Sequence, residues 1–501
     1  MVDALAWLRD DLGAFWAALR PPPLPGPGLR TWKRGGEGWR RRVHLRTGPA
    51  GDGLLFVDVT DVIHLNATAA AAVALLLDGA SAARTRAVLR RRHPDATGLA
   101  PAIDALAQLV GRLWNESACP SCELEAMGRA ALFSLPAGAP FKADLALTYG
   151  CNNACSHCYN EPDRVGMASL RAEQWRQVLD RLARVGVPHM IFTGGEATLH
   201  PDLPGLVEYA NGLGLVCGLN TNGRRLAQPA FLACLVQAGL DHVQITLSSS
   251  RAAVHDAING ARAFEQTLRG LDAVLASPLH TITNTTIDRR NRDHLVEIVD
   301  LLHEHGVRTF AMNGNIFSGG GFADPDAIPE DEMPPLLVSV RDRAAALGMR
   351  FLWYTPTEYC RMSPVELEIG AKRCNAGEYS ICIEPNGDVL PCQSFYVAAG
   401  NMLRDPWEQI WKGELFRSFR ERGQDPAGSG LPEKCWDCLD LPLCGGGCRI
   451  EREAREGVRT AKGAGSDCGV AEGMLARMEE ARGFRPGAAL TRRARKAGEG
   501  T

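Results

Sequence analysis

Three closely spaced cysteines are the residues of this sequence best suited to chemistry. Cys151, Cys155 and Cys158 fall within eight residues, and His157 precedes the last of them. A four-iron cluster that only carries electrons uses four protein thiolates, so three thiolates leave one iron open to a substrate or cofactor. A zinc ion completed by His157 is the alternative that the spacing leaves open. The residues therefore predict a metal centre, either iron–sulfur or zinc.

A second group of cysteines gathers toward the C-terminus. Eight of the 16 cysteines lie between residues 374 and 468, in a segment rich in glycine and proline that lacks regular periodicity. The Cys435–Cys438 pair alone would suggest a zinc ribbon, but the whole group predicts a domain organised by bound metal. The group consists of Cys374, Cys382, Cys392, Cys435, Cys438, Cys444, Cys448 and Cys468.

Five cysteines remain outside these two groups. Cys217 and Cys234 lie in apolar segments, where a small buried side chain is expected. Cys360 has no partner at a recognisable spacing. Cys119 and Cys122 form a pair for which a metal or redox role is possible, but we expect an unmetallated linker pair.

The elements that position the cysteine triplet are indicated by short β-branched runs that alternate with amphipathic stretches. It predicts six parallel strands, each followed by a helix, and hence an α/β fold with a partial (β/α)6 barrel. The expected strands are 143–148, 189–193, 215–220, 242–247, 281–287 and 308–313, and the expected helices are 169–185, 203–212, 229–238, 262–276, 293–305 and about 330–347. Glycine and polar motifs, including Gly150–Cys151 and Gly194–Glu196, follow strand ends, where such folds hold their active sites.

Before the barrel, the pattern predicts a winged-helix-like module. Two strands are expected at 54–59 and 61–65, followed by three helices at 67–77, 81–92 and 99–114. The expected domains are 1–28 (helix and proline-rich linker), 29–118 (module), 119–140 (linker), 141–360 (barrel), 361–475 (cysteine-rich domain) and 476–501 (tail).

Composition excludes several classes of protein. The 501 residues carry 55 basic and 58 acidic side chains, a net charge of −3, which does not favour nucleic acid as a partner. The arginines at 84–92 could suggest DNA binding, but only seven of the 55 basic residues are lysine, so arginine richness is general. There is no long apolar span for a membrane and no basic start typical of a signal peptide. We expect a cytoplasmic protein, whose cysteines bind metal rather than form disulfides.

The barrel motifs resemble the radical S-adenosylmethionine (radical SAM) superfamily. The resemblance rests on the cysteine triplet after the first strand and on Gly194-Gly195-Glu196 after the second, with Ala197 where a proline is common. It implies that the triplet binds a 4Fe-4S cluster whose open iron takes S-adenosylmethionine. The cofactor-binding residues that it implies are His157 near the adenine, Gly194, Gly195 and Glu196 at the methionyl amine, and Thr246 and Asn284 at the ribose and carboxylate.

The C-terminal spacing resembles the SPASM extension of radical SAM enzymes. This resemblance implies two auxiliary 4Fe-4S clusters, so that the chain would hold three clusters in all. The first auxiliary cluster would use Cys374, Cys392 and Cys448. Its fourth position would be taken by Cys382 or left open, and the resemblance favours the two alternatives almost equally. The second would use Cys435, Cys438, Cys444 and Cys468.

The N-terminal module resembles the PqqD-like peptide chaperone of pyrroloquinoline quinone biosynthesis, a recognition element for ribosomally made peptides. The similarity covers about residues 40–115 and rests on segments 62–69 and 75–79. It implies a precursor peptide as partner, held through its leader segment by strand addition to a sheet edge.

Together these resemblances imply an enzyme that cleaves S-adenosylmethionine reductively and modifies a peptide with the resulting 5′-deoxyadenosyl radical. A flavodoxin- or ferredoxin-type protein would supply electrons. Modification of a small molecule such as a tetrapyrrole side chain is the alternative reaction, and sulfatase maturation is disfavoured by Gln393 after Cys392. A non-catalytic redox sensor or peptide carrier is disfavoured by the intact Gly194–Glu196 motif. No catalytic acid or base is assigned, since Tyr354, Glu358 and Tyr359 are expected to be structural.

Overall fold

The computed structural model describes residues 26–36, 39–57, 61–92, 98–114 and 138–457. The helix predicted within residues 1–28, at 3–20, lies outside the described residues, as do the Cys119–Cys122 pair, Cys468 and the tail at 476–501. Among the described residues, no helix is long and apolar enough to cross a membrane.

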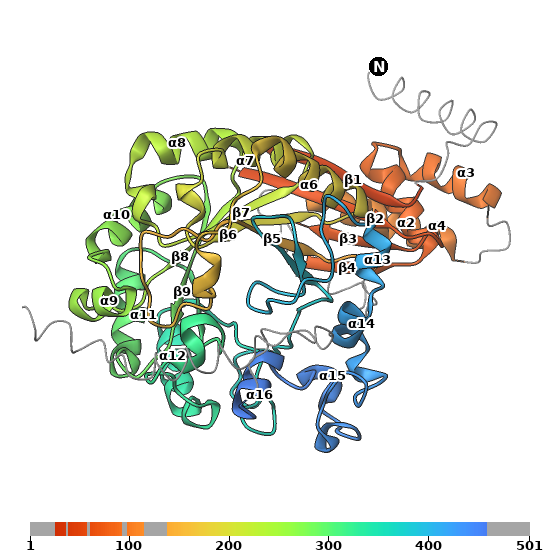
Figure 1. Cartoon of the computed structure of the whole chain (residues 1–501). Coiled ribbons are helices and arrows are strands. Elements are labelled where there is room, and N and C mark those ends of the chain that lie inside the picture. Colours follow the sequence, from red (N-terminus) through yellow and green to blue (C-terminus); the bar gives the residue numbers. More distant parts are fainter. Residues whose placement is uncertain (1–25, 37–38, 58–60, 93–97, 115–137, 458–501) are drawn as a thin grey trace, which may run out of the picture. The chain divides into compact units, whose positions relative to one another are not determined.

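A curved, mostly parallel sheet forms the centre of the described chain (Figure 1). Its strand order is β11-β10-β9-β8-β7-β6-β5-β12-β13, in which β5 to β11 and β12 run parallel and β13 runs antiparallel to β12. The strands are β5 (Lys142–Thr148), β6 (His189–Gly194), β7 (Val216–Thr221), β8 (His242–Thr246), β9 (His280–Thr286), β10 (Thr309–Asn313), β11 (Arg350–Trp353), β12 (Ser380–Ile383) and β13 (Val389–Leu390). The predicted partial barrel and its six strands are confirmed, and β11 to β13 are additions.

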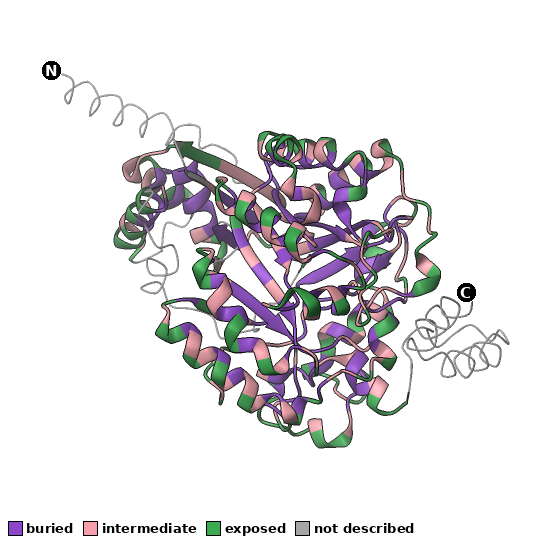
Figure 2. Cartoon of the chain, turned by 90° about the vertical axis from the view of Figure 1, so that its left-hand side faces the viewer, coloured by how far each residue is buried: buried purple, intermediate pink, exposed green. Residues whose placement is uncertain are grey.

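Amphipathic helices cover the outer face of this sheet, with buried faces toward the strands and exposed faces outward (Figure 2). In α6, for example, Trp175, Val178, Leu179 and Leu182 recur at helical spacing and are fully buried. The helices are α6 (Ala172–Val185), α7 (Leu203–Gly212), α8 (Pro229–Ala238), α9 (Ala252–Asn259), α10 (Phe264–Leu275), α11 (Leu295–Glu304) and α12 (Pro334–Ala346). Of these, α9 was not predicted.

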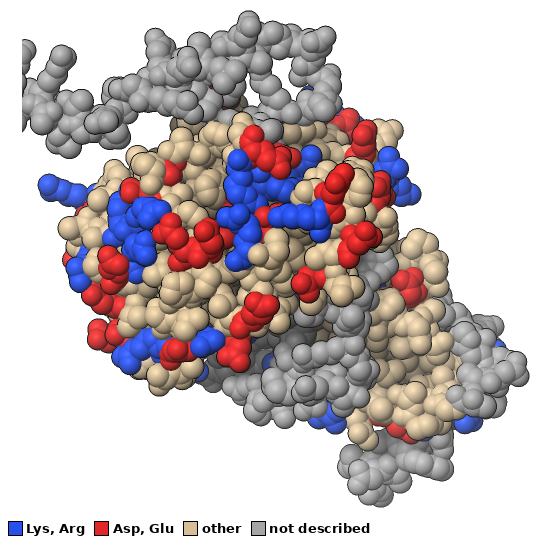
Figure 3. All heavy atoms as spheres, turned by 90° about the horizontal axis from the view of Figure 1, so that it is seen from below, with Lys and Arg blue, Asp and Glu red and all other residues tan. Residues whose placement is uncertain are grey.

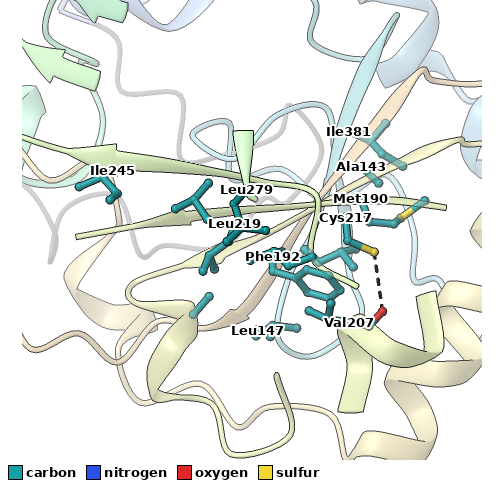
Figure 4. Packing of buried hydrophobic residues seen from close by; sticks show 14 of the residues in the cluster. Ala143, Leu147, Met190, Phe192, Val207, Cys217, Leu219, Ile245, Leu279 and Ile381 are labelled. Carbon is teal, nitrogen blue, oxygen red and sulfur yellow. Dashed lines mark hydrogen bonds between the residues drawn. The ribbon is translucent and has the colours of Figure 1, made fainter. Parts of the chain in front are cut away.

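Strand and helix side chains meet in one apolar core (Figure 4). Phe192, Cys217 and Leu219 belong to it and are fully buried, as predicted for Cys217. The prediction for Cys234 is wrong, because this cysteine is exposed. It lies on α8, where Leu232 and Leu235 occupy the buried face instead.

The N-terminal module is a four-stranded antiparallel sheet with three helices. Its elements are β1 (Gly28–Gly36), β2 (Trp39–Thr47), β3 (Gly53–Val57), β4 (Asp61–Leu65), α2 (Ala67–Leu77), α3 (Ala82–Arg92) and α4 (Leu99–Leu113). The three helices and the β3–β4 hairpin are confirmed, but the expectation of two strands is wrong. Arginines in β1 and β2 conceal the alternation of polar and apolar residues by which a strand is predicted. In β2, Val43 and Leu45 face the module's own core, and Arg42, His44 and Arg46, which alternate with them, are buried as well.

Those buried polar side chains attach the module to the base of the barrel. Arg42 pairs with Asp241 at 2.9 Å, and His44 Nε2 lies 3.0 Å from the carbonyl oxygen of Gly214. Arg46 donates to the carbonyl of Pro140 at 2.9 Å. Burial lowers the pKa of His44 to about 4, so the ring is neutral and its Nε2–H can donate. The module is therefore docked through defined polar contacts.

The cysteine-rich segment adds short helices beyond β13. These are α13 (Trp407–Trp411), α14 (Glu414–Arg420), α15 (Leu441–Cys444) and α16 (Arg449–Arg455). Short links join α13 to α14 and α15 to α16, and a longer segment joins α14 to α15. On the described surface shown in Figure 3, Lys and Arg are interspersed with Asp and Glu.

Two glycines allow β6 to end against the loop that follows β5. A Cβ added to Gly194 would come closer than 3.0 Å to the carbonyl oxygen of Thr148, and one on Gly195 would come equally close to the carbonyls of Tyr149 and Gly150. Gly194 also has a φ of +128°, which other residues rarely adopt. The glycine pair is thus required by contact between two backbones.

We expect Gly195→Ala to displace the loop after β5 and to lower the apparent Tm and the iron content after reconstitution, because neither crowding carbonyl can rotate away. The matched control is Gly205→Ala on α7, whose added Cβ meets nothing within 4 Å and should raise helix stability by up to about 1 kcal/mol. Unchanged stability and iron content in Gly195→Ala would contradict this account.

Candidate functional site

The cysteine triplet lies on the loop that leaves the C-terminal end of β5. Cys151 is exposed, whereas Cys155 and Cys158 are partly buried. Burial is the main cause of a raised pKa at each of the three thiols. The pKa of Cys155 is raised to about 12, because the neighbouring thiols of Cys158 and Cys151 raise it further. Three crowded thiols become thiolates together only when a cation stabilises them, and iron would do so.

The end of α9 supports one side of this loop. The Ala154 amide donates to the Asn259 carbonyl at 2.9 Å, and the Ser156 amide donates to the Ile258 carbonyl at 3.2 Å. The Cys155 thiol donates to Asn259 Oδ1 at 3.3 Å. Asn259 was not identified from sequence, and the missed helix α9 explains why.

A glycine-rich loop after β10 closes over the other side. The Gly321 amide donates to the Cys158 carbonyl at 3.3 Å. A Cβ on Gly319 or Gly320 would come closer than 3.0 Å to the backbone carbonyls of the cysteine loop. Glu161 accepts from the Gly319 amide at 3.1 Å. The run of three glycines at 319–321 was the available sequence signal.

Glu196 lies beside the triplet loop and is almost fully buried. Its Oε1 accepts from the amide and hydroxyl of Thr198 at 3.0 and 2.7 Å and from the Thr221 hydroxyl at 2.7 Å. Its Oε2 accepts from the Asn222 amide at 2.8 Å, which leaves that oxygen with acceptor capacity for a further donor. The backbone also joins the two motifs, since the Gly195 amide donates to Thr148 and the Glu196 amide to Gly150.

The other expected cofactor residues lie at neighbouring strand ends. Thr246 of β8 is paired in register with Asn284 of β9. Asn284 Oδ1 and His157 Nδ1 are buried and have no hydrogen-bond partner among the described residues. Both atoms can therefore still form a hydrogen bond to a polar ligand. The donor set and these two atoms thus fit S-adenosylmethionine and an iron–sulfur cluster.

The triplet does not form a single-ion site. Within the described ranges, no three His, Cys, Asp or Glu side chains are arranged to hold one metal ion. A four-iron cluster binds each thiolate through a different iron, so its ligands need not converge on one point. The arrangement of the triplet is thus compatible with a cluster.

Three C-terminal cysteines belong to one apolar cluster of the structure. Cys374, Cys392 and Cys448 pack with Phe395 and Phe419. Burial, together with Cys374, raises the pKa of Cys392 to about 12. The residues expected for the first auxiliary cluster are therefore brought together.

Cys382 lies next to this group but packs elsewhere. It is fully buried on β12, in a separate apolar cluster with Tyr149 and Tyr396. Burial raises the pKa of its thiol well above the usual value, and Cys392 is a smaller cause. Its role as a fourth ligand stays a prediction.

The cysteines expected for the second auxiliary cluster lie on a surface loop and on α15. Cys438 is exposed, and Cys435 is partly buried. The buried Cys444 accepts from the Tyr359 amide at 3.4 Å. Cys360, which the spacing left unassigned, lies beside this loop and accepts from Lys434 Nζ at 3.6 Å. Sequence spacing could not reveal this proximity, since more than 70 residues separate the segments.

The acidic and aromatic residues after β11 belong to the framework. Glu358 is buried and pairs with Arg455 and Lys434. The Tyr359 hydroxyl contacts the backbone of Lys372. Both side chains are therefore held by contacts within the protein.

Comparisons with known proteins agree with this geometry. The family model of the radical SAM superfamily matches residues 145–302, and that of an iron–sulfur cluster-binding (SPASM) domain matches residues 374–439. The PqqA peptide cyclase of Streptomyces rochei is 31% identical over 323 residues, which cover 63% of this chain and 85% of the relative. The mycofactocin maturase MftC of Mycobacterium tuberculosis is 31% identical over 321 residues, covering 62% and 78%.

Solved structures show the same fold. SuiB of Streptococcus suis bound to its precursor peptide SuiA superposes with a TM-score of 0.60 at 16% identity, covering 84% of this chain and 96% of SuiB. SuiB bound to S-adenosylmethionine superposes with a TM-score of 0.61 at 16% identity, covering 83% and 96%. From the matched family models and the extent of the relatives, the chain belongs to the radical SAM superfamily of enzymes, in the group with a SPASM domain, and this family uses S-adenosylmethionine and iron–sulfur clusters.

Proposed function

We propose that this enzyme modifies a ribosomally made precursor peptide. The observation that carries the proposal is the joint arrangement of the triplet loop against Glu196 and of a separate four-stranded module docked at the barrel. Relatives named as a PqqA peptide cyclase and a mycofactocin maturase support a peptide as the substrate class.

The triplet and the second motif divide the work at the cofactor. Cys151, Cys155 and Cys158 hold the cluster, and Glu196 with the Gly194–Gly195 backbone holds the methionyl end of S-adenosylmethionine. When bound and reduced by one electron, the cofactor would release methionine and supply a 5′-deoxyadenosyl radical for hydrogen abstraction from the substrate. His157, Thr246 and Asn284 orient its adenosyl portion. The loops over the triplet keep water away from the reacting atoms.

Two auxiliary iron–sulfur clusters complete the set of redox centres. Cys374, Cys392 and Cys448 hold the first, with Cys382 nearby. Cys435, Cys438 and Cys444 hold the second, for which the spacing assigns Cys468 as the fourth ligand. Such centres take up an electron from the product or bind substrate. A flavodoxin- or ferredoxin-type protein in the cytoplasm supplies the reducing electron.

The precursor's leader segment binds the N-terminal sheet at β4. The other edge strand, β1, lies against the barrel, where Lys33 donates to the Asn211 carbonyl at 2.5 Å and Thr31 lies close to Gly214. In the described chain, β4 has one strand neighbour, β3, so its outer edge is available for strand addition. The docked module holds the leader at a fixed place, which raises the local concentration of the core peptide.

Replacing Cys151, Cys155 and Cys158 together by alanine should abolish formation of 5′-deoxyadenosine, because the cluster that binds the cofactor is lost. The assay is chromatography of reactions that contain S-adenosylmethionine and dithionite. Cys234→Ala, an exposed cysteine on α8, is the control and should retain the activity. Activity in the triple variant would refute the assigned site.

Iron analysis of the anaerobically reconstituted enzyme should give about twelve irons per chain, from three clusters of four. Cys448→Ala should lower the value to about eight if the first auxiliary cluster requires it. A content near four, or zinc in place of iron, would overturn the assignment of the C-terminal cysteines.

A synthetic peptide encoded by a short reading frame beside the gene should slow amide hydrogen exchange in β4, because strand addition gives its outer amides new partners. Exchange in β1 should stay unchanged. The N-terminal half of the peptide alone should give the same protection. Protection of β1 instead, or none at β4, would contradict leader binding at this edge.

A further inference from the structure

A buried tyrosine from the cysteine-rich segment contacts the loop that carries the cysteine triplet. Tyr396 comes four residues after Cys392 and is 6% exposed. Its hydroxyl lies 3.2 Å from Asn160 Oδ1 and 3.3 Å from the Tyr159 carbonyl oxygen, with both oxygens as acceptors. Both acceptors directly follow Cys158. One side chain thus connects the segment of the first auxiliary cluster to the loop of the triplet.

Asn160 also contacts the Gly194–Glu196 motif. Its Nδ2 donates to the Gly194 carbonyl at 3.2 Å. The amide can bond both neighbours well in one orientation only, because a flipped amide would set Oδ1 against the Gly194 carbonyl, two acceptors together. The Tyr396 hydroxyl, by donating to Oδ1, favours the orientation in which Nδ2 holds Gly194. Three segments far apart in sequence are therefore joined in one chain of hydrogen bonds.

Tyr396 is itself held in place. The Arg164 guanidinium lies over its ring, 4.4 Å from the centroid, and pairs with the buried Glu384. Glu384 also accepts from the Tyr149 hydroxyl at 2.8 Å. The ring packs with Tyr149 and Cys382 in the small apolar cluster beside β12. A tyrosine fixed on all sides can position another group with little loss of entropy.

We propose that Tyr396 is a positioning residue for S-adenosylmethionine, acting through Asn160 on the Gly194 carbonyl. The proposal rests on the proposed binding of the cofactor's methionyl end at Gly194–Glu196. It makes the cysteine-rich domain a contributor to the cofactor site, in addition to its role in holding auxiliary clusters. Without the hydroxyl, Asn160 Oδ1 loses a hydrogen bond that helps to hold the orientation in which Nδ2 donates to the Gly194 carbonyl.

The test compares Tyr396→Phe with the wild-type, cluster-loaded full chain. Equilibrium dialysis with radiolabelled S-adenosylmethionine should show roughly three- to tenfold weaker binding, the effect of one neutral hydrogen bond. The KM for S-adenosylmethionine should rise by a similar factor, while the rate of 5′-deoxyadenosine formation at saturation changes less. The shift in the electron paramagnetic resonance signal of the reduced triplet cluster on addition of S-adenosylmethionine should require a higher concentration.

Two further variants separate positioning from a general structural role. Tyr379→Phe removes the hydroxyl of another buried tyrosine, which packs on Phe141, and should bind S-adenosylmethionine within twofold of wild type. Asn160→Ala should weaken binding, and the double variant with Tyr396→Phe should be no weaker than Asn160→Ala alone, because both act through one path.

Several results would overturn the proposal. They are wild-type affinity in Tyr396→Phe, additive losses in the double variant, or a weaker binding that accompanies loss of iron or a lower Tm. Failure of the proposed function would look different, because the wild-type enzyme would then show no binding of S-adenosylmethionine and no change of the cluster signal.

Discussion

The contact of two backbones at the ends of β5 and β6 is the constraint on which the site depends. The Gly195 amide donates to Thr148 at 2.7 Å and the Glu196 amide to Gly150 at 2.9 Å. These bonds continue the pairing of parallel strands into the loops, so the thiol-bearing loop and the acidic motif keep one register. Any side chain at the glycines would separate them. The position of the triplet loop against the acidic motif thus depends on the absence of side chains at the two glycines.

The rest of the barrel reinforces this contact from outside. The end of α9 bonds the triplet loop from one side and the loop at 319–321 covers it from the other. Glu196 is anchored by Thr221 and Asn222 at the end of β7, so the position of its carboxylate follows that of a third strand. A mobile loop of thiols would bind iron at random geometry, whereas strands, a helix and glycines hold this loop in one position.

Sequence patterns predicted those parts of the molecule in which local residues determine the outcome. The six strands of the barrel follow β-branched runs that end at polar motifs, and the triplet and Gly194–Glu196 meet as the strand order requires. Prediction failed where partners are distant. No strand was predicted over β2, where Arg42 and Arg46 are buried and bonded to the barrel. Asn259, Cys360 and Tyr396 contact segments that are distant in sequence, and no local periodicity of the sequence indicates these contacts.

Strand β5 explains how so many distant segments reach one place. On one edge it pairs with β6, and on the other with β12, where Cys382 stands opposite Asp144. The cysteine-rich segment therefore enters the sheet through the same strand whose end carries the triplet. Its position relative to Cys151 is set by backbone hydrogen bonds of the sheet. Because β12 leads through β13 to Cys392 and Tyr396 within a few residues, these two residues and the triplet loop are attached to neighbouring strands of one sheet.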